Sequence, residues 1–346
     1  MGIMTVNGVI SKEMLGVATP HEHALIDISN QYPGDCTPGS VGFDGKVAPQ
    51  YYAELMLDPY LLRDNLMLDS EELAIREVAA FAKAGGQSFV DLTVEGIGRN
   101  VAFLKRLSEE TGLHVVTCCG FYTGDAHPAR LKNMSIAQIA DEMVRELTEG
   151  IDGTGIKAGI IGEIGTSTEI MDEEIRVLKA SAIAHKRTGA PIMVHLSPWA
   201  QHGQFVTRLL LDEGVDPAHV CICHTDILLD TKDMKAIMDL GVYLEFDNFG
   251  KEFLAKNTYG TFPSDERRMQ TLYELIDAGY TDRLLVSCDI CLKNLLAAYN
   301  GPGYAHILQR ITPMLRAKYQ NAEEILHRIL VQNPANYLDN QRLGVL

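Results

Sequence analysis

Eight short apolar runs, each bounded by turn-forming residues, recur along the chain and have the length of buried β-strands. They cover 18–25, 88–94, 114–122, 158–165, 191–197, 219–225, 242–248 and 283–290. Helix-patterned stretches lie between them, most clearly at 70–85, 135–150 and 172–189, and each opens on Ser or an acidic residue and closes on Gly. Those residues are common at helix ends. Strict strand–helix alternation requires parallel strands, and eight repeats favour a closed (β/α)8 TIM barrel over an open sheet.

Two segments exceed a minimal barrel, yet neither requires a second domain, so we expect residues 1–346 to form one barrel. Residues 27–69, rich in Asp, Pro, Gly and Tyr, form a long insert after the first strand. Active-site loops follow barrel strands, so this insert is expected to wall the pocket. Residues 303–332 carry two apolar-periodic stretches that predict closing helices before NPANYL.

Composition and charge exclude several classes of protein. The 346 residues are 46% hydrophobic and 22% charged, as in ordinary globular proteins. The net charge of -16 opposes binding to nucleic acid or to anionic lipid surfaces. No apolar run of about 18 residues occurs, and the N-terminus lacks a signal-peptide pattern, so we expect a cytoplasmic protein without membrane association. Seven cysteines, an odd number, predict mostly reduced thiols.

The first predicted strand carries His21 and His23 in the stretch TPHEHALID. Side chains two apart in a strand point to one face, so both imidazoles converge while Glu22 points away. Taken alone, this pair is also compatible with coincidence or with hydrogen-bonded histidines in the core. Its significance depends on residues of the other strands.

Four other predicted strands end near a residue of metal-ligand type: Glu163, His195, His224 and Asp289. The carboxyl ends of barrel strands surround one mouth, so these residues should share a cavity with the histidine pair. Imidazole and carboxylate ligands suit zinc, manganese, iron or cobalt, and a carboxylate can bridge two ions. The opposing interpretation, unrelated polar residues at buried strand ends, would leave several costly unsatisfied groups.

The motifs resemble those of the phosphotriesterase family within the amidohydrolase superfamily, a resemblance that covers almost the whole chain. Besides the six residues, it rests on NGVIS and LGVATPHEH near the start, DLTVEGIGRN, KAGIIGEIG, EFDNFG and VQNPANYL. KAGIIGEIG and EFDNFG are closest to the glutamate-bridged branch, which includes phosphotriesterase homology proteins and the phosphotriesterase-related protein. The resemblance implies a barrel of the amidohydrolase type.

The resemblance also implies two divalent metal ions, with Zn²⁺ first and Mn²⁺, Fe²⁺ or Co²⁺ as alternatives. One ion would be held by His21, His23 and Asp289, and the other by His195 and His224. The founding phosphotriesterases bridge the metals with a carboxylated lysine, whereas this chain has Gly162 and Glu163 there, and Lys157 lies too far back. We therefore assign the bridge to Glu163. Because adjacent residues of a regular strand point oppositely, this assignment predicts a bulge or altered register.

The function implied is hydrolysis of a small ester, lactone or amide, including N-acyl amino-acid-like substrates. A water between the metals would become hydroxide near neutral pH, and Asp289 would carry its proton to the leaving group. Organophosphate-cleaving relatives have a relay histidine where EFDNFG has Asn248, which argues against phosphotriesters as natural substrates. Phosphotriesterase or lactonase activity on organophosphates or lactones is the alternative. A non-catalytic, metal-stabilised binding barrel is the second alternative. Small-molecule substrates are the expected partners, and a homodimer is possible by analogy with relatives.

Four further residues are candidates for substrate binding: Tyr122, Trp199, Asn248 and Lys293. Tyr122 and Trp199 follow predicted strands, although packing alone explains the tryptophan equally well. Lys293 and Arg99 could attract an anionic group, or could be solvated loop charges. The segment SPWAQHGQF after His195 lacks the arginines expected for a sulfonate or phosphate.

Strand periodicity and loop position lead to three further predictions about single residues. Cys221 and Cys223 should face the helices, opposite His224, while Cys291 should touch the pocket rim. His127 is more simply explained as a loop residue than as part of the site.

Overall fold

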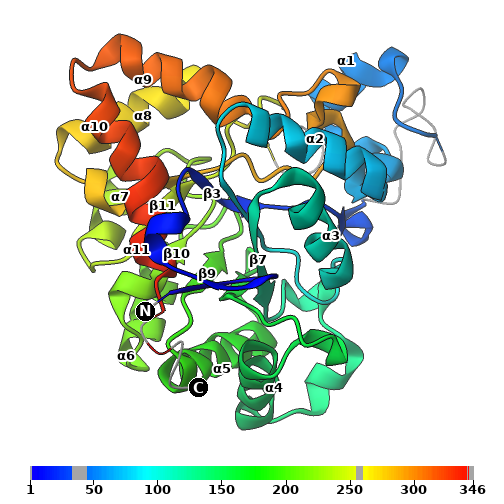
Figure 1. The fold of residues 1–346 in the computed structure, drawn as a ribbon, viewed down its shortest axis with the longest axis vertical. Coiled ribbons are helices and arrows are strands. Elements are labelled where there is room, and N and C mark those ends of the chain that lie inside the picture. The colour runs from blue at the N-terminus through cyan, green and yellow to red at the C-terminus, as the bar shows by residue number, and fades with distance from the viewer. Residues whose placement is uncertain (1, 33–44, 255–259, 341, 343–346) are drawn as a thin grey trace.

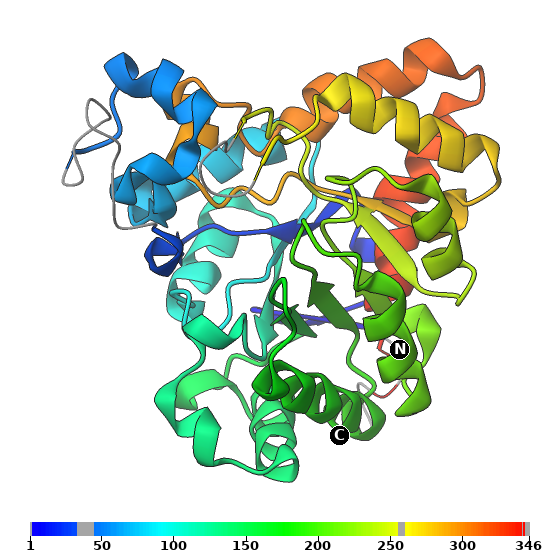
Figure 2. The same ribbon diagram turned by 180° about the vertical axis from the view of Figure 1, so that it is seen from behind.

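The computed structural model of the protein describes residues 2–32, 45–254, 260–340 and 342, and its centre is one sheet of eight parallel strands. The strands pair in the order β12-β11-β10-β9-β8-β7-β6-β3. Each predicted apolar run contains one strand, and helices surround the sheet (Figures 1 and 2). The expected (β/α)8 barrel is therefore confirmed. The strands are β3 (Ala18–Glu22), β6 (Ser88–Asp91), β7 (His114–Cys119), β8 (Ile160–Gly165), β9 (Ile192–His195), β10 (Val220–Ile222), β11 (Tyr243–Phe246) and β12 (Leu284–Val286).

A helix follows each of the first seven strands of the barrel, and the three clearest predicted helices are present. Ser70 and Ser135 cap two of them at the N-terminal end, and Ser135 forms a full capping box with Gln138. Gly189 ends the third in the left-handed conformation that glycine adopts without strain. The helices are α2 (Glu71–Lys83), α3 (Val101–Thr111), α4 (Ile136–Thr148), α5 (Asp172–Thr188), α6 (Gly203–Asp212), α7 (Thr231–Met238) and α8 (Asp265–Asp277).

The first and last strands of the barrel are joined by bonds that include side chains. The Glu22 carboxylate accepts the backbone N–H groups of Cys288 and Ile290 at 2.9 and 3.0 Å. Across the same seam, the backbone N–H of His21 donates to Ser287 Oγ at 3.0 Å. These bonds satisfy buried polar groups and bring the histidine pair beside the end of β12.

The insert and the chain ends pack around this barrel. Within 27–69, the described residues form α1 (Tyr52–Leu57) and β5 (Met67–Leu68), which pairs with β4 (Ile26–Asp27); residues 33–44 lie outside the described residues. A hairpin of β1 (Ile3–Thr5) and β2 (Gly8–Ile10) precedes the barrel and was not predicted. The closing segment contains α9 (Thr312–Lys318), α10 (Ala322–His327) and two π-helical stretches at Ile307–Ile311 and Arg328–Gln332.

The helical tail is longer than the sequence indicated. NPANYL, which we expected to follow the closing helices, is itself the helix α11 (Asn333–Leu338). This helix directly follows the π-helical stretch Arg328–Gln332, so α11 continues the helical tail that begins with α10. None of the helices within the described ranges is both long enough and apolar enough to cross a membrane.

Candidate metal centre

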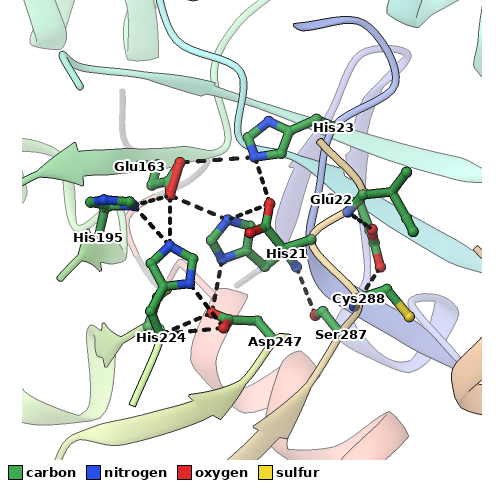
Figure 3. A network of polar contacts seen from close by, with 12 residues as sticks. His21, Glu22, His23, Glu163, His195, His224, Asp247, Ser287 and Cys288 are labelled. Carbon is green, nitrogen blue, oxygen red and sulfur yellow. Dashed lines mark hydrogen bonds and ion pairs between the residues drawn. The ribbon is translucent and has the colours of Figure 1, made fainter. Parts of the chain in front are cut away.

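The barrel brings together the six residues that the strand-end pattern singled out. Figure 3 shows the imidazoles of His21, His23, His195 and His224 grouped around the Glu163 carboxylate. These side chains come from β3, β8, β9 and the ends of neighbouring strands, and all of them are buried. Asp289, just past β12, completes the group from the other side of the seam.

Glu163 lies between two sets of histidines. Its Oε1 is 2.7 Å from His195 Nδ1 and 3.2 Å from His224 Nε2. The same oxygen is 3.4 Å from His21 Nε2, and Oε2 is 3.9 Å from His23 Nε2. This carboxylate contacts all four histidines, two from each pair. It therefore occupies the position expected of a bridge.

A bulge in β8 turns Glu163 into the barrel. Ile161 pairs with Ile192 but Ile164 pairs with Val194, so three residues of β8 oppose two of β9. Gly162 is at φ +128°, and a Cβ atom there would lie 2.3 Å from the carbonyl oxygen of Met193. Only glycine fits so close a backbone approach. The register change predicted from adjacent Gly162 and Glu163 is thus present.

Two of the six residues have unusual backbone conformations. His224 lies two residues past β10 and Asp289 three residues past β12, with φ of 58° and 46°. Positive φ is uncommon outside glycine, and it is found most often where surrounding structure imposes it at functional sites. At both positions it turns a side chain just beyond a strand toward the shared centre.

The donor set fits metal ions. The six residues form three groups within each of which the ligand atoms lie within 4.8 Å of one another: His21, His23 and Glu163; His21, His224 and Asp289; and Glu163, His195 and His224. Both ring nitrogens of His21 are buried without a hydrogen-bond partner among the described residues. Buried polar atoms normally have partners, so a nitrogen left in this state suits coordination. Nitrogen and carboxylate donors match zinc and its neighbours.

The charges of the six residues and their neighbours favour a bound positive ion. Burial alone would lower the pKa of His224, but Asp247 and Glu163 outweigh it and raise that pKa to about 10. Burial alone would raise the pKa of Glu163, yet His195 and His21 hold it well below its usual range. Burial also opposes ionisation of Asp289, but Lys251 and His21 lower its pKa. The carboxylates therefore stay ionised and can stabilise a bound cation.

A second layer of buried polar groups, which sequence reasoning missed, supports the histidines. Asp247 Oδ2 is 3.3 Å from His21 Nδ1, and Glu245 Oε2 is 3.7 Å from the same atom. Ser287 donates to Glu245 Oε1. The signal was available in EFDNFG, where two acidic residues two apart in a buried strand must face one interior. Such partners orient metal-binding imidazoles.

The strand-periodicity argument failed for Cys223. Its thiol lies inside the barrel, 3.7 Å from Glu245 Oε2 and in one group with His21 and Asp247. The reason is that β10 ends at Ile222, so alternation no longer relates Cys223 to His224, which has left-handed backbone. Glu245 is already bonded to Ser287, and Asp247 already contacts the imidazoles of His21 and His224. We therefore interpret this group of acidic residues and Cys223 as support for His21. The six cysteines within the described residues are free thiols, and Cys36 lies outside them.

A cavity of about 390 Å³ opens beside the six residues. Three candidate substrate-binding residues, Tyr122, Trp199 and Asn248, line it, as does Cys291. Tyr122 Oη is 3.3 Å from His195 Nε2, and Trp199 packs edge-to-face on Phe262. The insert after β3 contributes further lining residues, namely Ile28, Gln31 and Tyr60.

Lys293 and Arg99, the two positively charged residues that the sequence suggested for binding an anionic group, do not line this cavity. The Lys293 ammonium is 2.8 Å from Asp64 and 2.9 Å from Asp69, both in the insert. Arg99 forms two 2.7 Å hydrogen bonds with Glu146. Acidic partners distant in sequence engage both charges, which corrects the assignment of Lys293 to substrate binding and the interpretation of either residue as a solvated loop charge. His127 bonds to the Tyr122 backbone and does not line the cavity.

Sequence reasoning also missed a charged residue of the cavity lining. Lys251, in the loop after β11, is buried and its Nζ contacts Asp289 Oδ2. Among the lining residues that the structure describes, it is the sole lysine or arginine. Loop position alone gave no signal for it, because its placement depends on contacts with residues far along the chain.

Comparisons with known proteins agree with this geometry. The model of the phosphotriesterase family matches residues 1–338. The mouse N-acetyltaurine hydrolase is 35% identical over 344 residues, covering 97% of both chains. A resiniferatoxin-binding protein from Rhodobacter sphaeroides superposes with a TM-score of 0.94 at 36% identity, over 98% of this chain and 95% of that one. A lactonase from Listeria monocytogenes gives 0.79 at 26% identity, over 99% and 100%.

Proposed function

The chain belongs to the phosphotriesterase family, and on that premise we propose that this hydrolase uses two divalent cations to cleave a small carboxylic ester, lactone or amide. Zinc is the metal that the donor set fits best. The single observation that carries the proposal is the position of Glu163 between His21 and His23 on one side and His195 and His224 on the other.

Each side of Glu163 offers a complete set of protein ligands. His21, His23 and Asp289 would hold one ion, and His195 and His224 the other, with Glu163 shared between them. When bound, such a metal pair would lower the pKa of water at the site and polarise the carbonyl oxygen of the substrate. The chain's own residues then determine orientation and proton transfer.

Asp289 is proposed as the group that moves the proton. Its Oδ1 lies among the imidazoles, 3.1 Å from His23 Nε2 and 3.7 Å from His21 Nε2. From there it can take a proton from the attacking water and deliver it to the leaving oxygen or nitrogen. Because the carboxylate also borders the cavity, the leaving group can lie within its reach.

The side chains that line the cavity suit an acyl substrate. Tyr122 and Trp199 offer aromatic surface, and the Tyr122 hydroxyl faces the centre next to His195. Asn248 lines the cavity, but its amide donates to Asp226 and Asp247, each at 2.7 Å. An amide held in this way provides no proton relay, which disfavours phosphotriesters as natural substrates.

The experiment is a metal and substrate analysis of the purified chain. Elemental analysis should find two zinc ions per chain after reconstitution, and hydrolysis should require them. The panel is p-nitrophenyl acetate, γ-nonalactone, N-acetyltaurine and paraoxon, with turnover expected for at least one of the first three and little for paraoxon. Fewer than two bound metals, or turnover that survives their removal, would overturn the proposal.

A further inference from the structure

Lys251 contacts the proposed proton carrier directly, although it belongs to none of the expected ligand positions. It lies four residues beyond Asp247 in the loop after β11, and its side chain is buried in the cavity wall. Its Nζ donates to Asp289 Oδ2. A buried ammonium normally needs a partner of this kind, since burial of an unpaired charge is costly.

The contact divides the two oxygens of Asp289 between different neighbours. Oδ1 faces the imidazoles, 3.1 Å from His23 Nε2, whereas Oδ2 faces the ammonium of Lys251. The backbone N–H of Asp289 donates to the carbonyl oxygen of His21 at 3.3 Å, which fixes the residue from the other end. With both ends held, the carboxylate has one orientation toward the centre.

Lys251 is itself held rigidly. Its backbone N–H donates to the Asn248 carbonyl at 3.0 Å, and its own carbonyl accepts from Arg268 Nη2 at 2.9 Å. Arg268 is the largest wholly buried side chain, and its other nitrogens lie 3.2 Å from Asp226 and from Asp265. An arginine with this many partners anchors the loop to α8, the helix that carries it.

We propose that Lys251 is a positioning residue for Asp289: it holds Oδ2 so that Oδ1 alone faces the centre. The inference rests on the proposed function, because Asp289 is taken there as metal ligand and proton carrier. Asn248 is engaged with Asp226 and Asp247, whereas Lys251, among the described residues of the loop after β11, contacts Asp289.

A different role for Lys251 makes different predictions. As a cation in the cavity wall, it could instead bind an anionic group of the substrate. That role would require the ammonium to face the cavity, whereas the contact that it makes among the described residues is with Asp289. The two roles separate in the kinetics, because loss of substrate binding raises KM and loss of orientation at the centre lowers kcat.

The test compares zinc retention and kinetics in Lys251→Met and Lys251→Arg. Lys293→Met is the matched control, because it removes another buried, ion-paired lysine that lies outside the cavity lining. Zinc-loaded proteins are challenged with EDTA at a temperature where circular dichroism shows each one folded. Lys251→Met should lose one zinc about 10–100-fold faster than the unaltered protein, as is typical when an outer partner of a ligand is removed. Lys251→Arg should restore much of the retention, and Lys293→Met should retain zinc normally.

Kinetics with p-nitrophenyl acetate and N-acetyltaurine complete the test. Lys251→Met should lower kcat about 10–100-fold with little change in KM, for whichever of the two is turned over. Unaltered zinc retention and kcat in that variant, or a rise in KM confined to N-acetyltaurine, would overturn the proposal. Lys251→Leu replaces the methionine variant if the latter does not fold. Failure of the unaltered protein to bind zinc would instead overturn the proposed function, and this inference with it.

Discussion

The carboxylate of Asp247 accepts a hydrogen bond from the His224 imidazole, with 2.9 Å between Oδ1 and Nδ1. It also accepts the backbone N–H of His224, so the side chain and backbone of this residue are fixed together. A proton held on Nδ1 leaves the lone pair on Nε2, the nitrogen that faces Glu163 at 3.2 Å. Asp247 thus sets the form of the imidazole that a metal requires.

Asp247→Ala should weaken metal binding. Without its acceptor, the His224 ring loses both its tautomer and its orientation, and we expect zinc affinity or kcat/KM to fall about 10–100-fold. A competition titration with a zinc-binding dye measures the affinity. Asp141→Ala, which removes an exposed carboxylate paired with Arg187, is the control. Equal zinc affinity in the two variants would contradict the role assigned to Asp247.

Glu163→Gln should have a larger effect, because one side chain contacts both histidine pairs. Replacing the charged carboxylate with a neutral amide removes the ligand that both ions share. Both zinc ions should therefore bind more weakly, by more than the about 10–100-fold that loss of an outer partner costs. Elemental analysis after dialysis measures the occupancy. Glu77→Gln is the control, since this buried glutamate accepts only backbone N–H groups at Ala297 and Ala298. Retention of two zinc ions by Glu163→Gln would rule out the bridge.

The fold was predictable because its signals are local. Buried parallel strands appear as continuous apolar runs, and helix caps such as Ser135 and Gly189 mark the ends between them. The hairpin of β1 and β2 was not predicted, because strands of three residues are too short to show a period. The helix α11 was missed because the apolar-periodic pattern was followed only to residue 332, whereas the helical structure continues through NPANYL.

The candidate site was predictable only where strand geometry governs it. The rule that strand ends share one mouth placed the six residues correctly relative to one another, including Glu163 with its bulge. Two other side chains beyond strand ends were placed wrongly. Cys223 entered the interior, and Lys293 was drawn to Asp64. Such pairings depend on residues distant in sequence, which periodicity does not encode.

Arg99→Met should destabilise the fold. The guanidinium is 3% exposed and makes two hydrogen bonds to Glu146, so its removal leaves a buried carboxylate without a partner. Breaking a buried ion pair from one side costs about 3–5 kcal/mol. Urea denaturation measures the free energy of unfolding. Arg106→Met, where the arginine is 42% exposed and ion-paired, should cost about 1 kcal/mol or less. Equal losses in the two variants would contradict this account.

Trp199→Ala should weaken binding of an aromatic substrate. The indole lines the cavity and packs against Phe262 with ring centroids 5.5 Å apart. An aromatic contact contributes about 0.5–1.5 kcal/mol, so KM for p-nitrophenyl acetate should rise about 2–10-fold. Trp199→Phe retains a ring and should stay near the unaltered value. If KM is the same in all three proteins, the indole serves packing alone.

Asp289→Asn tests the chemistry most directly. The amide has the shape of the carboxylate but accepts a proton poorly, so the transfer from water to leaving group should fail. General acid–base groups contribute about 10²–10⁴-fold, and kcat should fall by that amount. The amide oxygen is expected to turn toward Lys251, which donates to Oδ2, and this would leave the amide nitrogen beside His23. Zinc binding would then weaken as well.

Saturating zinc separates these two effects of Asp289→Asn. If zinc is raised until elemental analysis finds two ions per chain, the remaining loss of kcat reports proton transfer alone. Asp64→Asn is a matched control, because this carboxylate is paired with Lys293 and Lys46 outside the cavity lining. It should lower stability without changing zinc content. Turnover by zinc-saturated Asp289→Asn within a few-fold of the unaltered protein would show that another group carries the proton, while Asp289 serves only as a ligand.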